Sequence, residues 1–320
     1  MKAPPNDVKT APGKTAAKSK KPRGAAAAAP AGEIVSELDP AVIEALASGR
    51  FADPFAVLGP HQTPRGRIVR AFLPGATGVR VIDRSGARLI AELQPAGAEG
   101  LFCGLAPGDE PYLLQIDWSG VAQETEDPYS FGLVLGDLDL HLFAEGAHWR
   151  LAERLGAAPM TMDGVAGVRF SVWVPNARRV SVVGDFNSWD GRRHPMRLRP
   201  QAGVWELFVP RLGAGALYKF EIVGPDGTQL PLKADPLARR TERPPATGSV
   251  VAALPDFHWT DADWMAQRPA RQRPNAAISI YEVHAGSWLR PEGHPQGVLD
   301  WTALTERLIP YVAQLGFTHI

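Results

Sequence analysis

The sequence predicts a mainly β protein: a disordered N-terminal tail, two tandem immunoglobulin-like β-sandwiches, and the first β-α-β piece of a truncated (β/α)₈ barrel. Three observations predict it. Short alternating apolar stretches are separated by Gly and Pro, the same pattern returns about a hundred residues later, and a helical stripe lies between two β-rich runs near the end of the chain. The 320 residues, 45% of them apolar, suffice for more than one core.

Charge and cysteine content limit the kinds of partner and metal site that the chain can have. Lys plus Arg and Asp plus Glu both number 34, so the balance favours neither nucleic acid nor an anionic membrane as a partner. No apolar run approaches about 18 residues, which predicts no membrane span. Cys103 is the only cysteine, which excludes an internal disulfide and the usual cysteine zinc sites and favours a cytoplasmic protein. We expect no metal and no cofactor.

Residues 1–32 form the predicted tail. They combine Pro, Gly and an Ala run with seven Lys and Arg side chains against a single acidic residue, Asp7, and such a segment buries too little apolar surface to fold. They also lack the apolar core of a signal peptide. Two interpretations remain: a basic arm for an anionic partner, or a solvated tail without a binding role, which the lack of aromatic or periodic patterning favours.

The first sandwich is predicted for residues 33–135. A short helix opens it, because Asp39 is a suitable N-cap, Pro40 fits the first turn and an apolar stripe ends near Gly49. Strands are predicted for four alternating stretches, residues 67–73, 79–83, 89–93 and 112–118.

The second sandwich, residues 161–255, repeats the first. The stretch 168–183 matches 67–82, since in both a strand reaches Pro, turns through a small residue and enters a second strand. Matching residues follow in both copies: Tyr112 and Tyr218, then Asp127 and Asp235. We infer two homologous domains, although alternating strands can also resemble one another by chance.

A helical connector is predicted between the sandwiches at residues 136–160, with an apolar stripe that Gly156 terminates. Its His141 and His148 have no metal-binding partner nearby in the sequence, so we interpret them as surface or packing residues. Residues 256–275, rich in Arg and Pro, are predicted as a linker to the next domain.

Three motifs follow one another in the second sandwich: Gly-Asp-Phe-Asn-Ser-Trp at 184–189, Gly-Val-Trp-Glu at 203–206 and Leu-Tyr-Lys-Phe-Glu at 217–221. Together they resemble the family 48 carbohydrate-binding modules of glycogen-active proteins. By position the resemblance implies that Trp189 and Lys219 bind carbohydrate. The chemistry agrees, because a Trp ring matches the C–H face of a pyranose and polar neighbours orient the sugar.

The sequence departs from that family at one point. A second tryptophan is expected a few residues after 226–227, where Gln229 and Leu230 stand instead. Trp189 therefore has two interpretations, direct sugar contact or packing of the module and its interdomain face. With a single ring we expect the isolated module to bind glucan weakly, with a Kd on the order of millimolar.

Residues 276–320 predict the start of a barrel. The stretch 278–284 is β-rich, a helix face runs through Leu304, Leu308 and Leu315, and a new strand begins at 317. Residues 281–288, 306–312 and 315–320 resemble the start of the barrel in bacterial 1,4-α-glucan (glycogen) branching enzymes, although Ala285 stands where that family usually has Leu. The resemblance to this family also covers four earlier segments in the same order, residues 53–59, 126–132, 137–140 and 230–236.

This resemblance implies an enzyme of glycogen biosynthesis. It cleaves an α-1,4-glucan and transfers the oligosaccharide to a 6-hydroxyl, forming an α-1,6 branch by a retaining mechanism with two carboxyl groups. In the family those groups lie on later barrel strands, and a complete barrel takes about 250 residues. We therefore expect no catalytic residue in this chain and no activity from it alone. Glu282 and Asp185 are predicted to be structural.

Two other functions stay open. One is a glycan-binding or regulatory module without catalysis, which gives no reason for the start of a barrel. The other is the N-terminal part of a related debranching hydrolase, a class that shares one such sandwich. The predicted partner is an α-1,4-glucan, glycogen or amylose, and we expect a monomer with no nucleic-acid or membrane partner.

Overall fold

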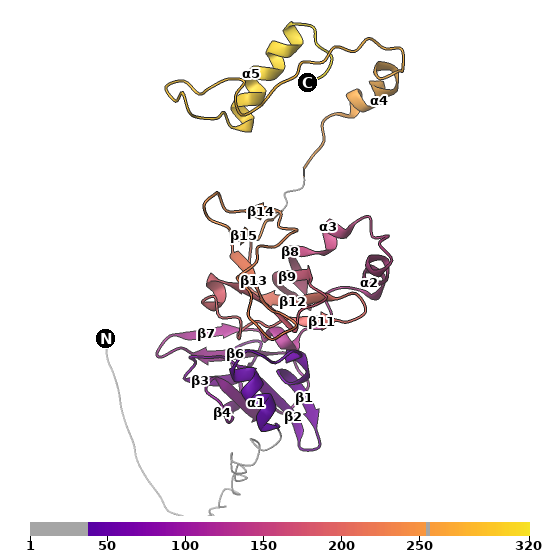
Figure 1. The fold of residues 1–320 in the computed structure, drawn as a ribbon. Coiled ribbons are helices and arrows are strands. Elements are labelled where there is room, and N and C mark those ends of the chain that lie inside the picture. Colours follow the sequence, from indigo (N-terminus) through magenta and orange to yellow (C-terminus); the bar gives the residue numbers. More distant parts are fainter. Residues whose placement is uncertain (1–37, 254–256) are drawn as a thin grey trace, which may run out of the picture. The chain divides into compact units, whose positions relative to one another are not determined.

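The computed structural model describes residues 38–253 and 257–320 (Figure 1), so the predicted tail at 1–32 lies outside the described residues. The chain divides into two compact units, one ending at residue 254 and one beginning at 255. The predicted mainly β class is confirmed by the strands of the larger unit. In the described part of the chain, no helix has the length and apolar character that crossing a membrane requires.

The first sandwich opens with α1 (Pro40–Ala47), as predicted. Asp39 Oδ1 accepts a hydrogen bond from Ala41 N at 2.8 Å and caps the helix, and Gly49 adopts a φ of +67° just after its end. The 3₁₀ turns are η3 (Pro54–Ala56) and η4 (Pro128–Ser130). The strands are β1 (Gly59–Thr63), β2 (Gly66–Phe72), β3 (Gly78–Asp83), β4 (Leu89–Pro95), β5 (Leu101–Leu105), β6 (Tyr112–Asp117) and β7 (Ala122–Thr125).

These strands form a curled sheet in the order β1-β2-β5-β4-β3-β6-β7. The sheet closes over one core, in which Val69 of β2 and Phe102 of β5 meet Val81 of β3 and Leu114 of β6. β2, β3, β4 and β6 correspond to the four predicted strands. β1, β5 and β7 were not predicted.

β2 is buried on both faces because the two sandwiches share apolar contacts. Its odd-numbered residues, such as Val69, face the core of the first sandwich, whereas Ile68 and Phe72 join a larger cluster that runs on into the second. Phe170 and Trp205 of the second sandwich belong to that same cluster. The two modules are therefore parts of one packed body.

The second sandwich consists of two four-stranded sheets, β11-β12-β9-β8 and β10-β13-β15-β14. Phe170 and Trp205 from the first sheet pack against Tyr218 and Phe220 from the second, and all four are essentially inaccessible to solvent. The strands are β8 (Gly156–Met162), β9 (Val165–Trp173), β10 (Arg179–Gly184), β11 (Arg197–Arg199), β12 (Val204–Pro210), β13 (Leu217–Val223), β14 (Arg240–Thr241) and β15 (Ser249–Val250).

The connector is shorter than predicted. Its helices are α2 (Asp137–Ala144) and α3 (Leu151–Arg154), but residues 156–160, predicted as its end, belong to β8. The reason is that β8 pairs with β9 along its whole length, from Gly156 opposite Ser171 onward. Phe143 of α2 lies edge-on to Trp173, with 6.1 Å between the ring centroids, and leaves Trp173 55% exposed.

A tyrosine–aspartate pair recurs at the same place in both sandwiches. Tyr112 at the start of β6 donates to Asp127 Oδ2 at 2.7 Å, and Tyr218 at the start of β13 donates to Asp235 Oδ2 at 2.6 Å. Each aspartate also accepts a backbone N–H two residues on, from Tyr129 in the first module and from the matching leucine in the second. This shared geometry supports the predicted duplication.

The smaller unit contains α4 (Ala262–Arg271) and α5 (Trp301–Gln314). Leu304 and Leu308 of α5 pack against Tyr281, Trp288 and Phe317. The β-rich run 278–284 is not a full strand as predicted: Ile280 makes only an isolated parallel bridge with His319. Within the described residues, no other strand pairs with these two segments, so the bridge does not grow into a sheet. The two bridged segments nevertheless precede and follow α5 in the chain, as the predicted β-α-β order requires.

Candidate functional site

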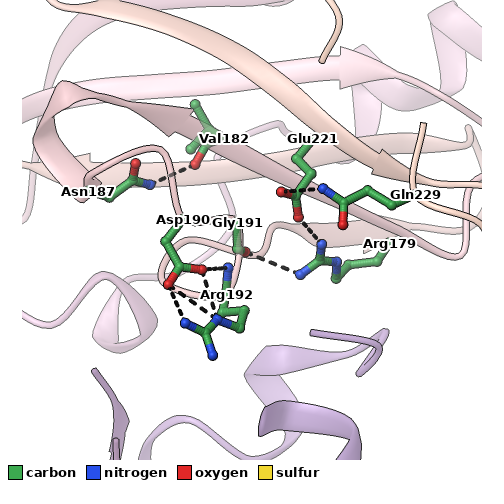
Figure 2. A network of polar contacts seen from close by, with 8 residues as sticks. All are labelled: Arg179, Val182, Asn187, Asp190, Gly191, Arg192, Glu221 and Gln229. Carbon is green, nitrogen blue, oxygen red and sulfur yellow. Dashed lines mark hydrogen bonds and ion pairs between the residues drawn. The ribbon is translucent and has the colours of Figure 1, made fainter. Parts of the chain in front are cut away.

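The loop that was predicted to carry the binding residues connects β10 to β11. Its first part, residues 184–194, is called here the Trp189 loop. Asn187 holds it onto the sheet, because its Nδ2 donates to Val182 O at 2.9 Å (Figure 2). Its Oδ1 also accepts from Gly184 N at 2.9 Å. The side chain thus closes the loop on the strand from which it emerges.

Trp189 is presented by an unusual backbone turn. Ser188 and Trp189 both adopt left-handed conformations, with φ of 57° and 59°, which costs free energy for non-glycine residues and marks sites held by their surroundings. Trp189 N donates to Gly184 O at 2.9 Å, and its indole Nε1 donates to Asp185 Oδ1 at 2.8 Å. The ring is half-buried, and Asp185, predicted to be structural, holds the indole in this orientation.

Beneath the loop lies a buried ion pair. Arg179 of β10 donates to Glu221 of β13, and the two residues are only 2% and 8% exposed. Arg179 Nη1 also donates to Gly191 O at 3.2 Å, which fixes the loop backbone above the pair (Figure 2). A Cβ atom at Gly191 would overlap the Glu221 carboxylate, so only glycine lets the chain pass this closely.

Lys219 lies at the same end of β10 and β13 as the Trp189 loop. It pairs directly with Val183, while its neighbour Tyr218 pairs with Gly184, where the loop begins. Its Nζ donates to Thr247 Oγ1 at 2.7 Å, so the ammonium is oriented by the segment between β14 and β15. The register therefore places both predicted site residues at one end of this strand pair.

Gln229 stands where a second tryptophan was expected, and it belongs to the same network. Its Nε2 donates to Glu221 Oε2 at 2.9 Å (Figure 2). The amide thus completes the hydrogen bonding of the buried carboxylate, while Leu230 beside it is partly exposed. Trp189 is the one tryptophan that this region offers to a ligand among the described residues.

Sequence reasoning missed the support of the loop. Arg179 and Gly191 were not singled out, and Glu221 was noted only as the last residue of the 217–221 motif. Glu221 lies diagonally across from Arg179 on the neighbouring strand, and such a pair of opposite charges could have indicated the support. Recognising it requires the register between β10 and β13, which the sequence does not give. In residues 38–253 and 257–320, no group of three or more His, Cys, Asp or Glu side chains could hold a metal ion.

The fold and this loop together define a tandem of an N-terminal sandwich and a carbohydrate-binding module. Residues 39–129 match the family described as alpha-1,4-glucan branching enzyme GlgB, N-terminal domain, and residues 154–238 match carbohydrate-binding module 48, the isoamylase N-terminal domain.

Curated relatives agree with these matches. The chain is 60% identical over 318 residues to the 1,4-alpha-glucan branching enzyme GlgB of Ralstonia nicotianae, covering 92% of this chain and 41% of that protein. It is 59% identical over 282 residues to the enzyme of the same name from Pseudomonas putida, covering 87% and 38%. The chain is thus similar to the N-terminal part of 1,4-α-glucan branching enzymes. It spans about two fifths of the length of these relatives.

Proposed function

We propose that this chain is the glucan-recognition part of a 1,4-α-glucan branching enzyme of glycogen biosynthesis. The whole enzyme would cleave an α-1,4-glucan and transfer the oligosaccharide to a 6-hydroxyl, forming an α-1,6 branch. The observation that carries the proposal is the 60% identity to a branching enzyme across 92% of the chain. A cytoplasmic location is part of the proposal, supported by the single cysteine, Cys103.

Within this function, we assign glucan contact to the Trp189 loop. The half-buried Trp189 ring would stack on the C–H face of a glucose unit. Lys219, already oriented by Thr247, would donate to a sugar hydroxyl. A single aromatic ring supports weak binding, with a Kd on the order of millimolar, which corresponds to a binding free energy of about 4 kcal/mol. Weak binding suits a module that retains a polymer near an active site.

The test is retention on an amylose or glycogen affinity gel. Trp189→Ala should weaken retention about tenfold, since stacking accounts for much of a weak contact, and Lys219→Met should weaken it less. Trp149→Ala is the matched control, because Trp149 on the connector is 97% exposed and lies outside the loop. Equal retention of the Trp189 and Trp149 variants would remove Trp189 from the site.

We further propose that the transfer chemistry needs carboxyl groups outside these 320 residues, as the two-fifths coverage of the relatives suggests. A polypeptide of residues 1–320 incubated with amylose should then form no branches, measured by debranching and chain-length analysis. New α-1,6 linkages at a rate proportional to the protein would place an active site in this part of the chain.

A further inference from the structure

We infer that the first sandwich positions the Trp189 loop of the second, and that Arg193 is the positioning residue. The inference rests on the proposed glucan contact at Trp189 and adds a role for the first module. It starts from the far end of the loop, where the side chain of Arg193 reaches out of its own module.

Arg193 makes two contacts with the first sandwich. Its Nη2 donates to Pro74 O at 2.6 Å, and its guanidinium carbon lies 4.4 Å from the ring centroid of Trp118. The first contact ties the side chain to the turn after β2, and the second places the cation over an aromatic face just after β6. A planar guanidinium can donate at its edge and stack with its face at the same time, which an ammonium group does less well.

The backbone of the same segment is also held from the first module. The hydroxyl of Tyr129 lies 3.4 Å from Arg193 O and 3.3 Å from Pro195 O and donates between them. Tyr129 is itself fixed, since its N–H is bonded to Asp127 and its ring packs edge-on against Phe55. Side chain and main chain at Arg193 are therefore anchored to the same neighbour.

A third contact comes from the end of α1. A Cβ atom at Gly49 would lie 3.0 Å from Arg179 Nη1 and 3.1 Å from Arg192 Cγ, so the helix terminus abuts both the loop and its buried ion pair. Arg192 in turn is bonded through Nε and Nη2 to the carboxylate of Asp190, next to Trp189 (Figure 2). The first module thus contacts Arg192, and Arg192 is bonded to the residue that follows the tryptophan.

Packing alone does not fix the loop at this point. A cavity of about 210 Å³ lies beside the contacts, lined by Trp118, Asn187, Arg193 and Leu212 among others. Incomplete packing leaves a segment free to shift unless polar contacts hold it. Only three residues separate Trp189 from Arg193, and backbone hydrogen bonds hold the segment between them: Arg193 N donates to Asp190 O, and Asp190 N donates to Asn187 O. A displacement of Arg193 is therefore transmitted to the ring.

The consequence is preorganisation of a weak site. A loop that is already ordered in the free protein loses less conformational entropy when it binds. In this arrangement the first sandwich needs no sugar contact of its own to affect glucan affinity.

The experiment compares variants of the full 320-residue chain on an amylose gel. Arg193→Gln should weaken binding on the order of tenfold, as expected when a segment must be ordered on binding, and Arg193→Lys should recover part of the loss. Hydrogen exchange in peptides covering residues 184–194 should speed up in Arg193→Gln, while exchange in β9 and β12 stays unchanged. Trp118→Leu, a change confined to the first module, should reproduce both effects.

The control is Arg211→Gln. Arg211 also bridges the modules, through Nε and Nη2 to Glu126 at 2.7 and 3.2 Å, but it lies outside the loop. It should lower the thermal midpoint without changing glucan affinity. If Trp189→Ala weakens binding while Arg193→Gln and Trp118→Leu do not, the site stands and the positioning role is overturned. If Trp189→Ala itself binds normally, the proposed site fails and the inference fails with it.

Discussion

At the scale of single residues, His194 closes the Trp189 loop through its neutral form. The Asn187 amide is fixed, because its Oδ1 accepts from Gly184 N and its Nδ2 donates to Val182 O. The remaining amide proton faces His194 Nδ1 at 3.0 Å, so that nitrogen must accept and the imidazole must be uncharged. Burial, aided by the charge of Arg193, lowers the pKa of His194 to about 4.

This arrangement predicts acid sensitivity of the loop. Because the pKa is lower in the folded than in the unfolded protein, the stability from His194 is complete above about pH 6.5 and is lost as the pH falls through about 4. The opening free energy of peptides covering 184–194, obtained from hydrogen exchange corrected for the intrinsic exchange rate at each pH, should therefore fall as the pH is lowered towards 4. His194→Asn, which can accept without titrating, should flatten that fall relative to the unmodified chain. A transition centred near pH 6.5 would contradict the assignment.

The Arg179–Glu221 pair predicts an asymmetric response to substitution. Glu221→Ala leaves the buried guanidinium of Arg179 without its counter-ion and should lower the free energy of unfolding by about 3–5 kcal/mol. Replacing both residues, Arg179→Met with Glu221→Leu, should cost much less, since no buried charge remains. Urea unfolding of the single and double variants measures the difference. A double variant as unstable as the single one would show that the charge is not the cause.

Part of the site could be predicted from the sequence. Trp189 and Lys219 were proposed from their positions in motifs that resemble the family 48 modules, and such motifs are local sequence patterns. The partner of Glu221 lies 42 residues away on another strand, and only the register between β10 and β13 brings it close. Gln229 illustrates the same limit: its position was noted for a missing ring, but its bond to Glu221 depends on the folded geometry.

At the scale of elements, each sandwich has a buried aspartate, Asp127 or Asp235, that accepts a hydrogen bond from a tyrosine on the strand before it. Burial raises the pKa of Asp127 from 3.8 to about 6, despite the bonds from Tyr112 and the Tyr129 backbone that oppose the shift. The bonds attach β6 to η4, and the second module repeats the arrangement at Asp235, whose pKa is raised for the same reason. The pair therefore ties a strand to the turn that leaves it.

The raised pKa predicts the opposite pH dependence from that of His194. The contribution of Asp127 is complete below about pH 3.8 and is lost as the pH rises through about 6. The difference in free energy of unfolding between the unmodified chain and Asp127→Asn should thus fall across this range. Chemical denaturation at half-unit pH steps measures it, and Asp83→Asn, at a solvent-accessible carboxylate whose pKa is lowered, is the control. A difference that grows with pH would mean that the carboxylate is stabilised in the fold.

Strands could be predicted where apolar and polar residues alternate along the chain, and they were missed where this alternation is absent. β3, in which the buried Val79 and Val81 flank the exposed Arg80, follows period-two alternation and was recognised within a residue of its observed bounds. β5, Leu101–Leu105, is a short run buried along most of its length, and β8 combines small residues with Pro159 and Met160. Such segments become strands because their neighbours supply the hydrogen bonds, which sequence periodicity does not report.

At the scale of the whole molecule, the tandem order of two sandwiches was predictable but their joint core was not. The duplication shows in the sequence as repeated motifs, whereas burial of both faces of β2 depends on a neighbour outside its own module. Ile68 and Phe72 look like ordinary apolar residues in the sequence. In the structure they belong to the cluster that continues to Phe170 and Trp205.

A shared cluster predicts shared unfolding. If Ile68, Phe72, Phe170 and Trp205 pack as one apolar body, opening one sandwich exposes part of the core of the other, and the two should unfold in one cooperative step. Hydrogen exchange should then give similar opening free energies for the central strands of both modules. Ile68→Ala should lower both together by about 2–5 kcal/mol, although the substitution lies in the first module alone. Val81→Ala is the informative comparison, because Val81 faces only the core of the first sandwich. If Ile68→Ala lowers protection in the first module and leaves β9 and β12 unchanged, the modules fold independently and the apolar contact between them is not cooperative.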